Sequence, residues 1–132
     1  MSIESTRDTM TRFFKAEHGD SSMMADDVVF TLMATGEEQH GKDAVMGMMT
    51  YLYHIAFDAK AAPKITIFGD NSAMAEYDFV GKHIGEFNGI PATGKDVCVP
   101  LCVVYDIEDG KIKRGRVYFE TPMLLQQLGI KM

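Results

Sequence analysis

Residues 97–120 of the 132-residue chain read VCVPLCVVYDIEDGKIKRGRVYFE. Two apolar stretches flank the pair Asp109-Gly110, and this arrangement is typical of two antiparallel strands joined by a tight hairpin turn. The sequence therefore predicts strands over 97–107 and 112–120. Pro100 cannot donate a backbone hydrogen bond, so we expect a bulge or a sheet edge at that position.

The rest of the chain places helices before strands. Apolar periodicity predicts helices over 3–17 and 41–57, with Gly19 ending the first helix, and Asp20 or Ser21 caps a short helix through about Ala25. Strands are expected over 28–33, 64–68 and 72–85, Pro63 ends the link before the second of them, and a short helix starts at Pro122. This order predicts an α+β fold, in which a cone-shaped, curved, mostly antiparallel sheet wraps around about three N-terminal helices in one domain, 1–132.

The predicted strand 72–85 alternates between two faces. One face carries a mostly apolar set, and the other is more polar. The first set is Ala73, Ala75, Tyr77, Phe79 and His83, and the second is Met74, Glu76, Asp78, Val80 and Lys82. Because a curved sheet over helices encloses a conical space, we expect a ligand site inside the cone.

Composition excludes several classes of protein. The net charge of −6 argues against a nucleic-acid partner, which would need a basic patch. No apolar run reaches the roughly 20 residues that span a membrane, and the polar N-terminus predicts a cytoplasmic protein. Cys98 and Cys102 lie about 13 Å apart on one strand, too far for a disulfide. Since two thiols without a second pair do not make a zinc site, we expect no metal and no cofactor.

Several segments, spread in order over nearly the whole chain, point to a family. They are DDVVF at 26–30, HGKDAV at 40–45, HIGEFNGIPATGK at 83–95, EDGKI at 108–112, VYFE at 117–120 and LLQQLG at 124–129. In these segments the chain resembles the SnoaL-like polyketide cyclase and ester cyclase group of the nuclear-transport-factor-2-like, or cystatin-like cone, superfamily. The resemblance implies a cone fold, a homodimer that pairs through the exposed sheet face, and ring closure by an intramolecular aldol reaction without metal or cofactor.

The resemblance also implies one acidic residue, near the end of the last long strand, that acts as acid and base. Glu120 stands at that position, where the family more often has Asp, and Arg116 stands where many relatives have Trp. An aldol closure needs a base beside the carbonyl and a donor for the oxyanion, and we expect Tyr118 to be that donor. Arg116 is expected to hold a substrate carboxylate or to pair with Glu120, and His54 and Tyr51 are expected to bind substrate. The alternative for Glu120 is a solvated carboxylate or the cap of the terminal helix.

Three further side chains are candidates for the site. Asp106 is the second carboxylate and can face Glu120 or Arg116 across the hairpin, unless it serves in a surface ion pair. His83 is a catalytic candidate, and its alternative is a strand-end histidine bonded to a loop carbonyl or buried in a dimer face. Asp78 is a candidate for substrate binding inside the cone.

The sequence leaves several functions open. The first is a cofactor-free cyclase, isomerase or lyase that acts on a small hydrophobic ketone or ester. The second is a module that binds such a ligand without turnover, and the third is a dimeric structural domain whose cone is filled by Met and Phe side chains. A variant of the first is epoxide hydrolysis by water activated in a carboxylate–arginine network, for which the candidates are Asp78, Asp106, Arg116 and Glu120.

Overall fold

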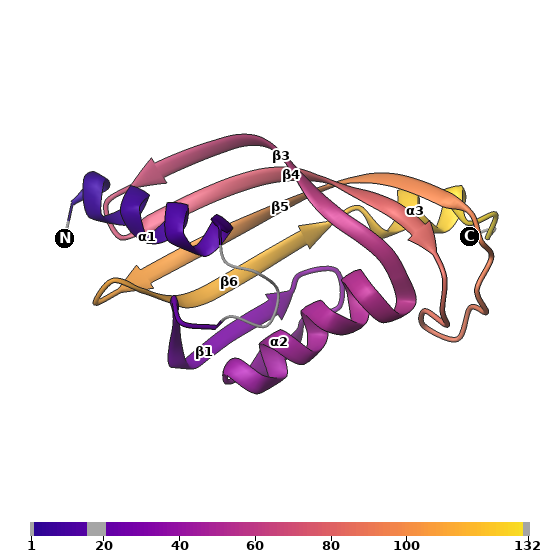
Figure 1. The fold of residues 1–132 in the computed structure, drawn as a ribbon, viewed down its shortest axis with the longest axis horizontal. Helices are drawn as coiled ribbons and strands as arrows, with labels where there is room; N and C mark the ends of the chain where they lie inside the picture. The colour runs from indigo at the N-terminus through magenta and orange to yellow at the C-terminus, as the bar shows by residue number, and fades with distance from the viewer. Residues whose placement is uncertain (1, 16–20, 131–132) are drawn as a thin grey trace.

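The computed structural model describes residues 2–15 and 21–130. They form three α-helices and six strands around one interior (Figure 1). In chain order the elements are α1 (Ile3–Lys15), β1 (Met24–Leu32), β2 (Glu37–His40), α2 (Lys42–Thr50), the π-helical segment η1 (Tyr51–Ala56), β3 (Phe57–Gly69), β4 (Ser72–His83), β5 (Asp96–Glu108), β6 (Lys111–Phe119) and α3 (Thr121–Gln127). None of the helices in these two ranges is long and apolar enough to cross a membrane.

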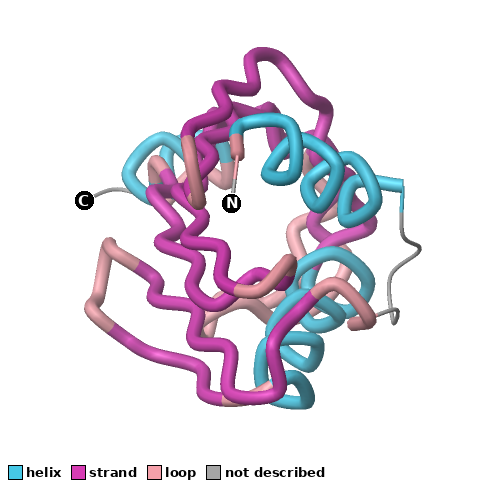
Figure 2. The backbone as a smooth tube through the Cα atoms, turned by 90° about the vertical axis from the view of Figure 1, so that its left-hand side faces the viewer, coloured by secondary structure: helices cyan, strands magenta, loops and turns pink. Residues whose placement is uncertain are grey.

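The six strands form one sheet in the order β2-β1-β6-β5-β4-β3. Neighbouring strands are antiparallel except for β1 and β6, which run parallel. The sheet curls, and helices α1 and α2 lie across its open side (Figure 2). This is the α+β cone that the sequence predicts.

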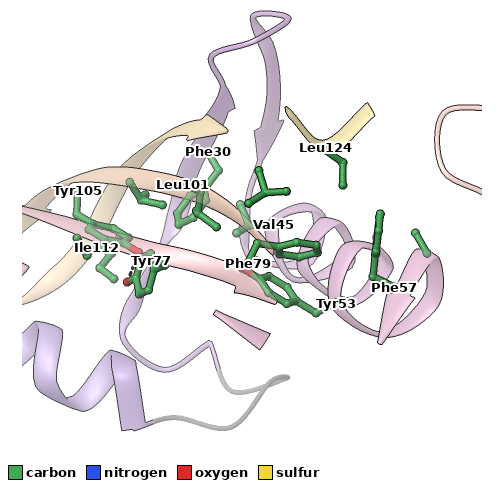
Figure 3. Packing of buried hydrophobic residues seen from close by; sticks show 14 of the residues in the cluster. Phe30, Val45, Tyr53, Phe57, Tyr77, Phe79, Leu101, Tyr105, Ile112 and Leu124 are labelled. Carbon is green, nitrogen blue, oxygen red and sulfur yellow. Dashed lines mark hydrogen bonds between the residues drawn. The ribbon is translucent and has the colours of Figure 1, made fainter. Parts of the chain in front are cut away.

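The core lies on the inner face of the sheet. The expected division of β4 into two faces is confirmed, since burial alternates along this strand and along β5, as the pleat requires. Aromatic rings fill much of the interior (Figure 3). The inner residues of these two strands are Ala73, Ala75, Tyr77, Phe79 and His83 on β4, and Val97, Val99, Leu101, Val103, Tyr105 and Ile107 on β5.

Two elements near the N-terminus differ from expectation. The predicted short helix through Ala25 is absent, because residues 22–23 form a turn and β1 already begins at Met24, which pairs with Ile112 of β6. The predicted helix end at Gly19 and the cap at Asp20 lie outside the described residues. Strand β2 was not predicted, since its four residues are polar and sit at the sheet edge, where no apolar alternation is needed.

Strand β3 is longer than expected and contains Pro63 in its interior. The sheet tolerates this proline because β3 is an edge strand, where a missing N–H need not break a ladder. The register shifts between Pro63 and Ile65, which marks a bulge. Beyond the bulge, Ile65 and Ile67 pair with the outward residues Glu76 and Met74, so both isoleucines lie on the outer face.

Pro100 lies in β5, a central strand, yet it occupies a local edge. The pairing of β6 with β5 ends at Leu101, so only β4 pairs with β5 at Pro100, while the register shift falls at Asp106. The uncovered edge is closed by α3. Its Gln127 accepts a hydrogen bond from the Cys98 amide through Oε1 and donates one to the Cys98 carbonyl through Nε2, both at 2.8 Å.

Candidate functional site

The buried polar groups of the cone are hydroxyls and one imidazole. Within 2–15 and 21–130 no Asp or Glu is buried, and no cluster of His, Cys, Asp and Glu could hold a metal ion. The buried side chains with a polar atom that is not sulfur are Thr6, Thr9, Thr31, Tyr53, Tyr77, His83 and Tyr105. The described interior therefore offers hydrogen-bond donors, and any described carboxylate base must act from a more exposed position.

Tyr77 of β4 and Tyr105 of β5 bring their hydroxyl oxygens to 3.2 Å from each other inside the cone (Figure 3). Either hydroxyl can be the donor, but only one hydrogen lies between the two oxygens. The other O–H keeps a hydrogen to donate, and no other described residue accepts it. Aromatic rings surround the pair, with ring centroids of Phe13 and Phe30 at 5.7 and 6.4 Å from that of Tyr105 and Phe14 at 6.1 Å from Tyr77.

Burial keeps these phenols protonated. Desolvation raises the pKa of Tyr53 to about 12. Desolvation also raises the pKa of Tyr77 and Tyr105 well above that of an exposed tyrosine, because the charged phenolate is disfavoured in an apolar interior. At neutral pH the Tyr77–Tyr105 pair is therefore a donor to a carbonyl oxygen or an oxyanion, and it is not a base.

His83 lies at the end of β4, fully buried, with its ring stacked on Phe57 at 5.0 Å between centroids. Its Nδ1 lies 3.2 Å from the Thr93 amide nitrogen and 3.0 Å from the Thr93 hydroxyl. Because an amide N–H can only donate, Nδ1 accepts and the hydrogen of the neutral ring is on Nε2, which has no partner within the described ranges. The partners of His83 are thus the amide and the hydroxyl of Thr93, whereas a loop carbonyl was expected. Six residues of strand, about 20 Å, separate His83 from Tyr77, so the two cannot serve one carbonyl group.

Asp106 and Arg116 form a two-point ion pair on the outer face of the sheet. The guanidinium donates to the two carboxylate oxygens at 2.8 and 3.0 Å. This hydrogen bonding lowers the pKa of Asp106 and raises that of Arg116. Arg116 lies outside the cone because Val117 and Phe119, which alternate with it along β6, pack against the core.

The other outer-face candidates are Tyr118 and Asp78. Tyr118 also alternates with the core residues of β6, and Asp78 makes an ion pair with Lys64 at 3.6 Å. Arg116 and Tyr118 therefore lie outside the cone. Asp78, which was expected inside the cone, lies on the outer face of β4.

Glu120 follows β6 and occupies the position before α3, but its side chain makes no capping hydrogen bond. It lines an open pocket of about 240 Å³ together with Met33, Ala34, Tyr118 and Phe119. The structure thus brings two predicted site residues, Glu120 and Tyr118, to one pocket. Phe119 pairs with Leu101, which is four residues, or about 13 Å, from Tyr105 along β5.

The two candidates near the end of α2 lie at the surface. The Tyr51 hydroxyl donates to the Glu86 carbonyl at 2.7 Å, and this bond holds the loop after β4. His54 is exposed as well. Tyr53 of η1 enters the cone, and its ring lies 5.2 Å from that of Phe79.

Sequence reasoning missed Tyr105 as a site residue. The signal was present, since Tyr105 alternates with Val103 and Ile107 in an apolar strand and therefore had to share their buried face.

One comparison with known proteins gives the family, and another gives the fold. A family model described as SnoaL-like polyketide cyclase matches residues 6–128. A search of curated proteins finds no match. Among solved structures, a candidate SnoaL-like polyketide cyclase from Jannaschia sp. CCS1 superposes with a TM-score of 0.84 at 14% identity, over 98% of this chain and 94% of the other.

Two further solved structures give similar values. TsrD from Streptomyces laurentii has a TM-score of 0.81 at 21% identity, over 99% of each chain. A phenazine biosynthesis-related protein from Pseudomonas aeruginosa has a TM-score of 0.78 at 22% identity, over 98% of this chain and 88% of the other. At these identities the likeness shows a shared fold.

Proposed function

Because the chain belongs to the SnoaL-like polyketide cyclase family, we propose that it is a cofactor-independent cyclase or isomerase that acts on a small hydrophobic carbonyl compound inside the cone. The observation that carries this proposal is the Tyr77–Tyr105 pair, which lies among aromatic rings and has one O–H hydrogen that no other described residue accepts. The rings suit the apolar body of a ligand, and the spare hydrogen suits its carbonyl oxygen.

In the proposed reaction a base takes a proton from the carbon next to the carbonyl. The electrons of that C–H bond form the carbon–carbon double bond of an enolate, and the carbonyl electrons move onto oxygen. As the oxygen becomes negative, its hydrogen bond from the tyrosine pair strengthens, so the pair favours the transition state over the bound ketone. In an aldol closure the enolate carbon then attacks a second carbonyl of the same molecule. In an isomerisation the proton returns at another carbon.

Glu120 remains the proposed acid and base, and its support is the pocket that it shares with Tyr118. About 13 Å of strand β5 separates Leu101, the partner of Phe119, from Tyr105, so the Glu120 pocket and the tyrosine pair are two different places along the sheet. The two places are alternatives: in the pocket Glu120 is the base and Tyr118 the donor, whereas in the cone the tyrosine pair is the donor and no described carboxylate is buried beside it as base. Asp106, whose pKa is lowered by Arg116, is the weaker candidate for proton abstraction, and the neutral His83 offers a donor at Nε2.

Enolisation can be measured without knowing the natural substrate. We expect the protein to accelerate the exchange of the methyl hydrogens of methyl naphthyl ketone for deuterium in heavy water, followed by proton NMR. If the cone is the site, the double change Tyr77→Phe and Tyr105→Phe removes the oxyanion donor and slows exchange by about 10²-fold or more. The double change Glu120→Gln and Tyr118→Phe then leaves the exchange rate within a small factor of the wild-type rate.

If the double change in the tyrosine pair leaves the exchange rate unchanged and Glu120→Gln with Tyr118→Phe slows it, the reaction takes place in the Glu120 pocket. Tyr51→Phe is the matched control, because it removes a hydroxyl that lies outside both places. Absence of any accelerated exchange by the wild-type protein, with tight binding of the ketone, would favour the binding module over the enzyme.

We also propose that two copies pair through the outer face of the sheet. The register places Ile67, Met74 and Val104 side by side on three neighbouring strands, and the two larger residues at the β3 end are 53% and 39% exposed. The pair Asp106–Arg116 lies at one side of this row, and Lys64, which pairs with Glu76, lies at the other. Such a patch has both charge signs around an apolar centre, so it can match a second copy of itself across a two-fold axis.

Light scattering during size-exclusion chromatography is expected to give the mass of a dimer. Ile67→Lys should then give the mass of a monomer, because it places a charge in the apolar centre of the interface. Ile3→Lys, a change at an exposed isoleucine on α1, should leave the mass unchanged. A monomeric wild-type protein would overturn this part of the proposal.

A further inference from the structure

We propose that Phe13 and Phe14 of α1 form a cover over the Tyr77–Tyr105 pair, and that Phe14 controls which ligands reach it. The inference rests on the proposed function only in its choice of ligand, a flat aromatic or polycyclic carbonyl compound. The cover itself follows from ring contacts and burial.

Each phenylalanine covers one tyrosine of the hydrogen-bonded pair. The ring centroids of Phe13 and Tyr105 lie 5.7 Å apart, and those of Phe14 and Tyr77 lie 6.1 Å apart, both in edge-on contact. Phe13 and Phe14 also touch each other at 5.9 Å. The four rings therefore form one cluster of tilted and edge-on contacts, and the hydroxyls of its two tyrosines are 3.2 Å apart.

Burial falls across this cluster of four rings from the interior outward. Tyr105 is 3% exposed and Tyr77 is 8% exposed, whereas Phe14 is 40% exposed. Phe14 thus has solvent on one side and Tyr77 on the other. Loss of its ring would open a path from solvent to the Tyr77 hydroxyl, while loss of the half-buried Phe13 would instead leave a gap in the core contact with Tyr105.

The helix is fastened elsewhere, so the cover can move without undocking it. The Asn71 amide donates to Thr6 Oγ1 at 3.1 Å, and the Thr9 hydroxyl donates to the Gly110 carbonyl at 3.2 Å. Both contacts join α1 to hairpin turns of the sheet, and Met10 is fully buried beside them. Phe14 lies beyond these anchors as the last residue but one of α1, so we expect a rotation of its side chain to uncover Tyr77 while the helix stays in place.

A first test needs no ligand. The chain has five Tyr and no Trp, so its fluorescence reports tyrosines alone. We expect Phe14→Ala to make this fluorescence more sensitive to quenching by acrylamide, and the further change Tyr77→Phe to remove most of the increase. Ile3→Ala, at an exposed position of the same helix without a tyrosine contact, should leave quenching unchanged. Unchanged quenching in folded Phe14→Ala would overturn the proposal.

A second test uses methyl naphthyl ketone as the probe in stopped-flow binding. Phe14→Ala is expected to raise the association rate several-fold, and Phe14→Leu to give an intermediate rate if the alanine variant proves poorly folded by circular dichroism. Equal association rates in the wild type and both variants would overturn the role in access. Failure of the wild type to bind the ketone at all would count against the proposed function, while the quenching result would still decide whether the cover exists.

Discussion

Phe79→Ala is expected to lower the free energy of unfolding by about 3–5 kcal/mol, the range for removing a fully buried phenylalanine. The ring of Phe79 lies 5.2 Å from those of Tyr53 and Phe57 and 5.5 Å from that of Phe119. These neighbours come from η1, β3 and β6, so the change leaves a cavity between elements that cannot all move together to fill it. The total free energy of unfolding of such a domain is about 5–15 kcal/mol, so the change would remove a large part of its stability.

Urea unfolding followed by circular dichroism measures this loss as a shift of the midpoint. Phe79→Leu is the matched variant, because it keeps an apolar side chain in the same place and should cost clearly less than alanine. Equal losses for the two variants would contradict the assignment of Phe79 as the centre of the aromatic core. A lower urea midpoint with an unchanged slope of unfolding free energy against urea concentration would show that the change lowers stability without changing the compactness of the denatured state.

The inner and outer faces of the central strands could be predicted from sequence, because the period of two in β4 is strong and continuous. The same rule fails at β3. There the bulge after Pro63 adds a residue on one strand only, so that Ile65 and Ile67 change face. Nothing local in the sequence shows that Pro63 lies inside a strand, since this depends on β3 being an edge of the finished sheet.

The missing helix near Ala25 has a similar origin. Short segments such as 21–25 have weak local preferences, and the parallel pairing of β1 with β6, which starts at Met24, decides where the strand begins. The same pairing carries Met33 and Ala34 to the end of β6, where they line a pocket with Glu120. Because the partners are more than eighty residues apart in the chain, only the sheet topology shows that this pocket exists.

Part of the candidate site could be predicted from the sequence. Tyr77 could be placed on the inner wall from alternation, and the pairing of Asp106 with Arg116 was among the alternatives. The bond of His83 to Thr93 was not visible, because it requires the loop after β4 to return to the strand end. The outward orientation of Arg116 follows from the apolar pair Val117 and Phe119, whose burial outweighs any preference of the charged residues between them.

Gly81→Ala is expected to destabilise the fold by about 3 kcal/mol, at the upper end of the range for overpacking. A Cβ atom at this position would lie 2.3 Å from the Asp58 carbonyl oxygen and 2.5 Å from the Ala59 Cα. Both atoms belong to the backbone of β3, so the clash cannot be relieved by a side-chain rotation. Strands β3 and β4 would have to separate close to the pair Phe57 and His83.

Gly47→Ala is expected to stabilise the fold, which is the opposite of the effect expected for Gly81→Ala. Gly47 lies inside α2, and a Cβ atom there would meet nothing within 4 Å. Alanine is a better helix former than glycine by about 0.8–1 kcal/mol, so this variant should unfold at a higher urea concentration than the wild type. The two glycine changes add the same methyl group and should shift the midpoint in opposite directions. A shift of both in the same direction would mean that the close approach of β3 and β4 at Gly81 does not determine the cost.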